Sequence, residues 1–171
     1  MATFGKTNVG TFTNGSFGTS PSAIGVSQFL APDSNMVVSK LTVRQTSVQV
    51  AISTAASSIR GLIYADDGFD KPSSLLAITQ ETSTVATQNN VWLSLPFSPE
   101  PELPVSGKYW LGIMANGRFT TASSIAGLNS FMDTVSYPTV TSTYSETTEN
   151  GNQKSIYATY SSVLGVSVYL T

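Results

Sequence analysis

Hydrophobic and polar residues alternate along short stretches of the chain. The pattern becomes regular from Met36, and between residues 40 and 44 Lys, Thr and Arg alternate with Leu and Val. A period of two is typical of a half-buried strand, whose successive side chains point to opposite faces. Between residues 48 and 52 the hydrophobic residues occupy the other parity. This change predicts a turn near Thr46 and Ser47, with a further strand after it.

Similar patterns predict strands elsewhere in the chain, separated by clusters of Asp, Gly, Pro and Ser that end strand pairing. Four lie in the middle of the chain and two close it, at residues 59–65, 75–79, 91–97, 108–115, 156–160 and 166–170. Residues 1–25, rich in Gly, Ser and Thr, predict an N-terminal strand followed by a loop. About nine or ten short strands without a helix predict an all-β fold, a jelly-roll-like, two-sheet antiparallel β-sandwich. We expect residues 1–171 to form this sandwich as a single domain.

Residues 120–155 show no clear periodicity. The stretch is rich in Ser, Thr and Asn but also contains scattered aromatic and aliphatic residues. A structureless loop of this length is unusual in a compact domain. We therefore expect one or two irregular strands with exposed loops, and a turn at Tyr137-Pro138.

The composition excludes several kinds of chemistry. The 171 residues include no His and no Cys, which removes imidazole bases, thiolate nucleophiles, disulfides and thiolate metal sites. Only 11% of the residues are charged, whereas 26 are Ser and 22 are Thr, so hydroxyl groups hydrate the surface. Paired carboxylates remain as catalytic candidates, but Glu100 and Glu102 lie in a Pro-rich segment that predicts an exposed connection. We expect no enzymatic activity.

Charge and hydropathy limit the partners. Eight basic residues against ten acidic ones give a net charge of −2 and form no cluster, whereas binding to a phosphate backbone needs several Lys or Arg on one surface. No stretch reaches the roughly 18 apolar residues of a membrane helix, and the first residues lack the apolar run of a signal peptide. We therefore expect a soluble chain made in the cytosol, with neither nucleic acid nor membrane as a partner.

An acidic cluster follows one of the predicted strands. Asp66, Asp67 and Asp70 lie close together in the sequence, and carboxylate oxygens are the ligands that calcium prefers. Their spacing does not match that of a helix-loop-helix calcium site. The alternative is a turn, because Asp-Gly is a preferred turn dipeptide and Asp side chains accept hydrogen bonds from nearby backbone. The sequence leaves open a structural calcium ion at these three residues, and we expect no other cofactor.

Aromatic residues are the candidates for ligand contact, because exposed rings stack on the apolar faces of sugars. Trp92 and Trp110 lie on predicted strands, each opposite in parity to aliphatic neighbours. Core packing is the alternative for both, since large aromatic side chains are usually buried. Tyrosines, which carry a polar group, are better candidates for a contact surface near loops, and they are Tyr137, Tyr144, Tyr157 and Tyr160. The candidate glycan contacts are therefore Trp92, Trp110, Tyr137 and Tyr144.

Six stretches spread over most of the chain form a further pattern. They are FGKTNVG (4–10), GLIYAD (61–66), PSSLLA (72–77), VWLSLPF (91–97), LPVSGKYWLGI (103–113) and YATY (157–160). In this order they resemble β-sandwich modules of bacteriophage virion proteins and extracellular bacterial proteins, which are often described as carbohydrate-binding-like jelly rolls. These stretches correspond to strands and turns. The resemblance implies a non-enzymatic module that binds glycans or forms part of a particle surface.

Two functions from different classes follow from this resemblance. The first is a bacteriophage structural accessory protein, either a capsid decoration protein or a tail-associated component. Such a protein would reside in the virion, bind other virion proteins and form a homo-oligomer, and it would need no export signal because phages leave the cell by lysis. The alternative is a carbohydrate-binding module, extracellular or at a cell surface, that recognises a cell-surface glycan.

Overall fold

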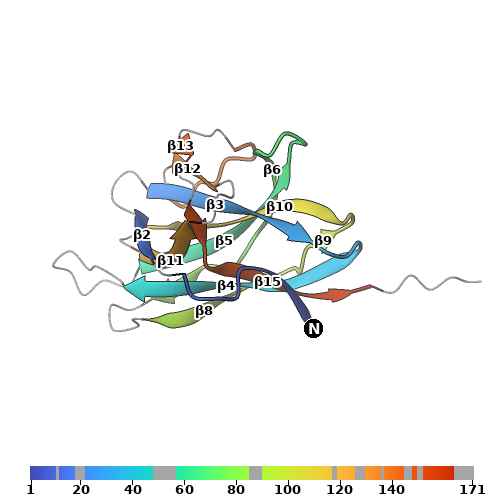
Figure 1. Ribbon diagram of the computed structural model, residues 1–171, viewed down its shortest axis with the longest axis horizontal. Coiled ribbons are helices and arrows are strands. Elements are labelled where there is room, and N and C mark those ends of the chain that lie inside the picture. Colours follow the sequence, from blue (N-terminus) through green and yellow to red (C-terminus); the bar gives the residue numbers. More distant parts are fainter. Residues whose placement is uncertain are drawn as a thin grey trace, which may run out of the picture.

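The computed structural model consists of β-strands arranged in two antiparallel sheets, and the part of the chain that it describes contains no helix (Figure 1). The described residues are 1–10, 12–17, 22–47, 57–84, 90–116, 119–125, 130–135, 137–144, 148–149 and 152–163. The all-β, two-sheet antiparallel sandwich predicted from the sequence is confirmed. Within the described ranges, no helix could cross a membrane.

Sheet A contains eight strands, and β4 is its central strand. The order is β1-β15-β4-β11-β14, with β2 paired to β11 and with β8 and β9 paired to β4. β4 pairs with β15 along one edge and with β8 along the other. The bounds are β1 (Ala2–Gly5), β2 (Phe12–Phe17), β4 (Met36–Ser47), β8 (Val91–Pro96), β9 (Glu102–Leu103), β11 (Phe119–Ile125), β14 (Asn152–Lys154) and β15 (Ile156–Ser162).

Sheet B contains seven strands in the order β13-β12-β3-β10-β5-β6, with β7 paired to β5. Its central strands β3, β10 and β5 come from distant parts of the sequence and pair along most of their length. The bounds are β3 (Ser22–Ala31), β5 (Ser57–Asp66), β6 (Pro72–Ile78), β7 (Thr82–Thr84), β10 (Gly107–Ala115), β12 (Ser130–Val135) and β13 (Thr148–Glu149).

The main hydrophobic core lies between the two sheets. Side chains from β4, β8 and β15 of sheet A pack there with side chains from β3, β5 and β10 of sheet B. Leu41 and Val43 are fully buried in this core, as the alternation in β4 predicted. Their polar neighbours, Lys40, Thr42 and Arg44, therefore belong to the opposite, outer face of sheet A.

A second hydrophobic cluster covers the outer face of sheet B. It combines residues of β3, β5 and β10 with later residues, and its buried members are Ile24, Val26, Leu62, Tyr64, Trp110, Met114, Phe131, Val135 and Tyr144. The segment at residues 137–144 is held there by backbone hydrogen bonds to β6, from Leu75 to Ser142 and from Tyr144 to Ser73, each 2.9 Å long. The central strands of sheet B are consequently buried on both faces, which explains why β10 shows no clean alternation of hydrophobic and polar residues.

Several predicted elements differ from the structure. β4 continues through Thr46 and Ser47, so the predicted turn at these two residues is wrong. The N-terminal strand predicted within residues 1–25 is present as β1, and residues 6–10 follow it without a strand; the remainder of the predicted loop is wrong, because β2 and the start of β3 lie there. β3 was not predicted from the sequence, because both of its faces are largely buried and this removes the period-two pattern. The strands predicted at residues 48–52 and 166–170 lie outside the described residues.

Residues 120–155 contain more strand than expected. Most of β11 and all of β12, β13 and β14 lie in this stretch, where one or two irregular strands were predicted. The predicted turn at Tyr137-Pro138 is confirmed. Five apolar residues of the stretch belong to or pack against the second cluster, on the outer face of sheet B, whereas Met132 packs against the main core; the five are Phe131, Val135, Tyr137, Val140 and Tyr144.

Candidate functional site

The acidic cluster forms the connection between β5 and β6. Asp67 Oδ1 accepts hydrogen bonds from the backbone N–H groups of Phe69 (2.7 Å) and Lys71 (3.1 Å). Asp66 Oδ1 accepts one from the N–H of Gly68 (2.9 Å), whose φ of 88° suits a tight turn. These bonds are those of a turn stabilised by Asp side chains, which is the alternative that the sequence left open.

Two of these carboxylates also join three strands of sheet B. Asp66 Oδ2 accepts hydrogen bonds from Gln28 Nε2 of β3 and Trp110 Nε1 of β10, both 2.9 Å long. Gln28 Nε2 also donates to Asp70 Oδ1 at 2.8 Å. Lys108 Nζ donates to the same Asp70 oxygen and forms an ion pair with it. The network therefore ties the loop after β5 to β3 and β10.

The ion pair shifts the pKa values of both partners. The hydrogen bond from Lys108, followed by that from Gln28, lowers the pKa of Asp70. The hydrogen bond to Asp70 raises the pKa of Lys108. Because the two side chains are 47% and 46% exposed, water screens the pair, and it adds little to the stability of the fold.

The structure brings Asp66, Asp67 and Asp70 into one loop but directs their oxygens to protein donors. In the described ranges, no group of three or more acidic, His or Cys residues is arranged to hold a metal ion. Calcium binding at this loop therefore stays a prediction from the sequence.

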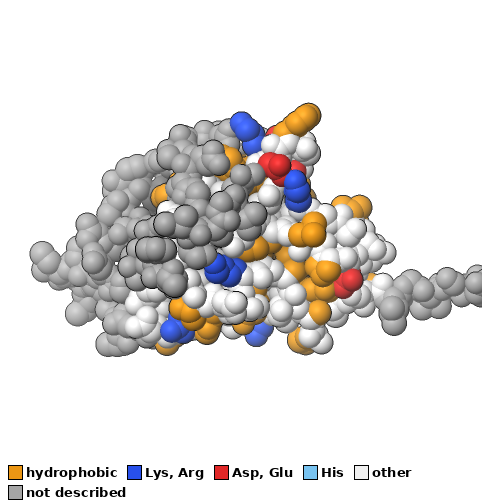
Figure 2. Space-filling view, viewed as in Figure 1, with side chains coloured by type: hydrophobic (Ala, Val, Ile, Leu, Met, Phe, Trp, Pro, Cys, Tyr) orange, Lys and Arg blue, Asp and Glu red, His pale blue; other side chains and the backbone are white. Residues whose placement is uncertain are grey.

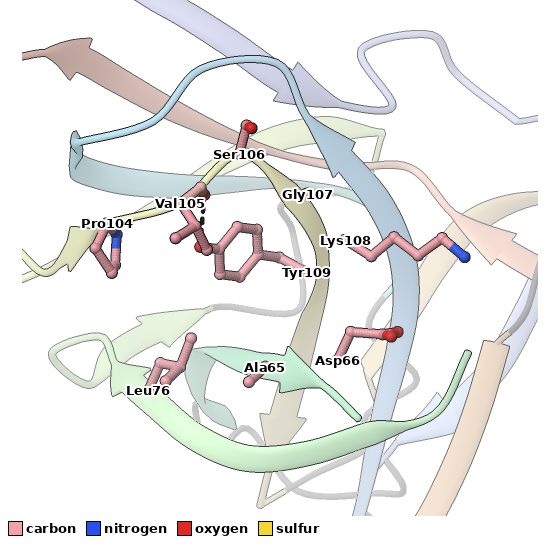
Figure 3. A pocket seen from close by; sticks show the side chains of 9 residues that line it. All are labelled: Ala65, Asp66, Leu76, Pro104, Val105, Ser106, Gly107, Lys108 and Tyr109. Atoms are coloured by element: carbon pink, nitrogen blue, oxygen red, sulfur yellow. Dashed lines mark hydrogen bonds between the residues drawn. The ribbon is translucent and has the colours of Figure 1, made fainter. Parts of the chain in front are cut away.

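A hollow of about 260 Å³ lies beside the network, between β6 and the segment that leads into β10 (Figure 3). Leu76, Pro104, Val105 and Tyr109 provide much of its lining. The Tyr109 hydroxyl donates a 2.8 Å hydrogen bond to the Val105 carbonyl, and burial raises the pKa of this tyrosine. The volume of the hollow is below the roughly 300–1,000 Å³ of typical small-molecule pockets. It suits a protruding apolar side chain better than a separate ligand.

Exposed hydrophobic side chains lie around this hollow at one end of sheet B. We call Leu30, Phe69, Leu76 and Val105 the end patch; their exposures are 71%, 85%, 43% and 60%. Leu76 and Val105 line the hollow, while Leu30 stands opposite Lys108 in the pairing of β3 with β10. Near the loop between β5 and β6, Figure 2 shows acidic and basic side chains side by side, with hydrophobic ones above and below them. Exposed hydrophobic side chains that gather at one end of a sheet, with charged groups among them, are a candidate interaction surface.

Two of the predicted glycan contacts are buried. Trp110 is fully buried, and its ring lies 5.3 Å from that of Phe131. Tyr144 is 6% exposed and packs edge-on against Tyr64, also at 5.3 Å. Neither ring presents a face to a ligand, because both belong to the cluster that covers sheet B. Core packing, the alternative for Trp110, accounts for its position.

Tyr137 is partly exposed and belongs to a polar group on sheet B. Its hydroxyl donates a 2.5 Å hydrogen bond to Glu81 Oε2, which also pairs with Arg60 at 3.4 Å. This hydrogen bond is the main cause that lowers the pKa of Glu81, whereas burial is the main cause that raises the pKa of Tyr137. Its hydroxyl is therefore already engaged within the protein.

Trp92 lies on the outer face of sheet A, where its ring meets that of Tyr157. The ring centroids are 5.4 Å apart and the planes are inclined by 62°. The Arg44 guanidinium lies 5.8 Å from the centre of the Trp92 ring, a cation–π contact. We call Trp92, Tyr157, Arg44, Thr42 and Lys40 the aromatic face. Of the predicted aromatic contacts, Trp92 and Tyr157 are the pair that the structure brings together at the surface.

Tyr160, also considered as a contact residue, faces the main core and is 3% exposed. Its hydroxyl donates a 2.6 Å hydrogen bond to Asp33 Oδ2. This bond, with burial, raises the pKa of Tyr160 to about 12. Tyr160 stabilises the fold, and its buried side chain is not available to contact a ligand.

Lys154 was missed by the sequence analysis. It is 3% exposed, and its Nζ lies 3.1 Å from Ser130 Oγ, to which it donates a hydrogen bond. Burial lowers the pKa of this lysine to about 7. A single Lys in a Ser/Thr-rich stretch is usually exposed, so no local pattern distinguishes it.

Comparison with known proteins found no matching family model, no similar curated protein and no similar solved structure. The end patch and the aromatic face are therefore the features of the molecule that bear on its function.

Proposed function

We propose that the protein is a non-enzymatic structural accessory component of a bacteriophage virion, a capsid decoration or tail-associated protein that acts through protein–protein contacts. The observation that carries this proposal is the end patch. Of its four exposed hydrophobic side chains, Leu76 and Val105 line the hollow, and Lys108, which pairs with Asp70, lines it as well. An apolar centre with charged groups at its rim is the usual arrangement of a protein interface.

Low charge supports the same proposal. With 11% charged residues, the chain has few means of selecting a partner by long-range electrostatics. Shape and apolar contact must then provide most of the specificity, and the hollow lined by Leu76 and Val105 has the size for one inserted side chain. Other virion proteins and further copies of this chain are the partners that fit the proposal.

Mass spectrometry of purified particles tests the proposal. We expect the chain to copurify with virions of its source, and we expect Phe69→Ser with Leu30→Ser to reduce its incorporation. Val9→Ser is the matched control, because Val9 is 54% exposed but lies outside the end patch. Absence of the chain from purified particles would refute the virion proposal. Equal incorporation of the end-patch variant and the control would refute the assignment of the contact surface.

A second candidate function is carbohydrate recognition, favoured by the partly exposed Trp92–Tyr157 ring pair on sheet A. Paired aromatic rings beside hydroxyl-bearing residues form a surface on which sugars bind. This face lies on the opposite sheet from the end patch, so a protein could use both. Binding of the intact chain to a panel of glycans tests it.

A further inference from the structure

The outer face of sheet A places its functional side chains on three adjacent strands. In the register of the sheet, Arg44 of β4 stands opposite Trp92 of β8, and Thr42 stands opposite Tyr157 of β15. The strands of Trp92 and Tyr157 flank β4, yet the two ring centroids are only 5.4 Å apart. The rings must therefore lean toward each other over β4. Ser94, exposed and opposite Thr42, adds a hydroxyl group to the same face.

Two cations on this face have no counter-ion among the residues that the structure describes. Within the part of the chain that the structure describes, neither Lys40 nor Arg44 forms an ion pair, in contrast to Arg60 and Lys108. Lys40 and Arg44 point to the same side of β4 and are about 13 Å apart along the strand. Figure 2 shows basic and hydrophobic side chains together along the lower border, over β4 and β8, with no acidic side chain among the described residues there. The acidic residue opposite β4 is Glu102, which pairs with Val37 near the far end of the strand.

Two buried polar atoms of this face lack hydrogen-bond partners within the described part of the chain. Among the described residues, the buried Thr42 Oγ1 and Arg44 Nε have no hydrogen-bond partner. Thr42 is 3% exposed, although it belongs to the outer face. Leaving such a group unsatisfied costs about 1–3 kcal/mol, and proteins commonly retain this cost at functional sites. A ligand that shifts a ring and offers an oxygen or a hydroxyl would recover these bonds.

We propose that the aromatic face binds an acidic glycan, with Arg44 recognising a sugar carboxylate and the Trp92–Tyr157 pair contacting the sugar rings. A guanidinium held against an aromatic ring is preorganised for bidentate hydrogen bonding to a carboxylate. Lys40 reaches a second carboxylate further along the same glycan chain, and Ser94 serves the sugar hydroxyls. The inference rests on the second candidate function above and names its ligand class.

Binding of the intact protein to carboxylated glycans tests the inference. The probes are oligogalacturonate, hyaluronan and polysialic acid, each measured by calorimetry at low salt. The methyl ester of each probe is its matched neutral counterpart, because it keeps the sugars and removes the charge. We expect at least one carboxylated probe to bind and its neutral counterpart to bind much more weakly.

Three charge-removing variants locate the contact. We expect Arg44→Gln to weaken binding about tenfold or more and Lys40→Gln about threefold, since hydrogen bonds to charged groups are stronger than simple screened attraction. Lys108→Gln removes the same charge from the far sheet and should leave the affinity unchanged. The unfolding midpoint of each variant verifies that it is folded.

Each outcome decides between the proposals. Equal binding of the charged and esterified forms of every probe that binds would overturn the acidic ligand and leave carbohydrate recognition standing. No binding to any glycan, charged or neutral, would overturn both. Equal loss of affinity in Lys108→Gln and Arg44→Gln would overturn the assigned face, because net charge alone would then explain binding. Arg44-dependent binding to vesicles containing phosphatidylglycerol, without binding to the carboxylated glycans, would assign the face to an anionic lipid surface instead.

Discussion

Replacing Lys154 with methionine should stabilise the protein at neutral pH, and the gain should fade in alkaline solution. The ammonium of Lys154 is buried between the sheets, where its Nζ donates to Ser130 Oγ and its backbone N–H donates to Ser27 Oγ. Methionine has a similar length and can occupy the same space without a charge. Ser130 Oγ keeps a partner in the variant, because it also donates a 2.8 Å hydrogen bond to the Val26 carbonyl.

The expected size of the stabilisation follows from the pKa of Lys154. Burial lowers that pKa from 10.5 to about 7, which corresponds to a destabilisation of about 5 kcal/mol when the group is fully protonated in both states. Between these two values the unfolded chain binds more protons than the folded one, so the wild-type free energy of unfolding rises with pH. Below the folded-state pKa the full penalty is present, and near pH 10.5 it has almost disappeared. The advantage of the variant should therefore be about 4 kcal/mol at pH 7 and about 2 kcal/mol at pH 9.

Urea unfolding followed by tryptophan fluorescence at pH 6, 7, 8 and 9 measures this effect. Lys108→Met is the matched control, because Lys108 is exposed and its raised pKa leaves it protonated in both states over this range. A difference between Lys154→Met and the wild type that does not change with pH would refute the reasoning. A variant less stable than the wild type at pH 6 would refute it as well.

Three further outcomes are expected from stability measurements. Asp66→Ala leaves the buried Trp110 N–H without its acceptor and should lower the free energy of unfolding by about 1–3 kcal/mol, whereas Asp66→Asn, which keeps an acceptor oxygen, should lose less. Gly112→Ala places a Cβ 2.6 Å from Val26 Cγ1 and should lower it by about 1–3 kcal/mol. EDTA should leave the thermal unfolding midpoint unchanged, because Asp66, Asp67 and Asp70 accept hydrogen bonds from protein donors; a decrease that calcium reverses would establish the calcium site instead.

The strands that sequence analysis found are those with one buried face. In β4 and β8 the inward Leu and Val residues alternate with polar or exposed residues, and this period of two is visible without a structure. β3 and β10 lie in the middle of sheet B and are buried on both faces. β10 was still recognised from its dense apolar run, whereas β3, with Ser27 and Gln28 among its buried residues, was not. The burial of the outer face of sheet B depends on residues 137–144, which are far from β3 in the sequence.

The candidate sites, like the strands, were predictable from the sequence only in part. The sequence placed Trp92 and Trp110 on strands but could not say which ring is exposed, since parity relative to neighbours defines a face and not its surroundings. Trp110 packs against Phe131 and donates a hydrogen bond to Asp66, whereas Trp92 contacts Tyr157 at the surface. The role of Arg44 has no local signal, because it depends on a tryptophan on a neighbouring strand.

The sequence by itself determined the all-β class, the two-sheet arrangement and the absence of His and Cys chemistry, because these depend on local periodicity and composition. Only the tertiary structure decided which aromatic rings are buried, why the pKa of Lys154 is lowered, and which exposed side chains form the end patch and the aromatic face. The physical reason is that burial and contact in a β-sandwich arise between strands far apart in the chain. Of the residue pairs that define these surfaces, Arg44 with Trp92, Trp92 with Tyr157 and Asp70 with Lys108, none is adjacent in sequence.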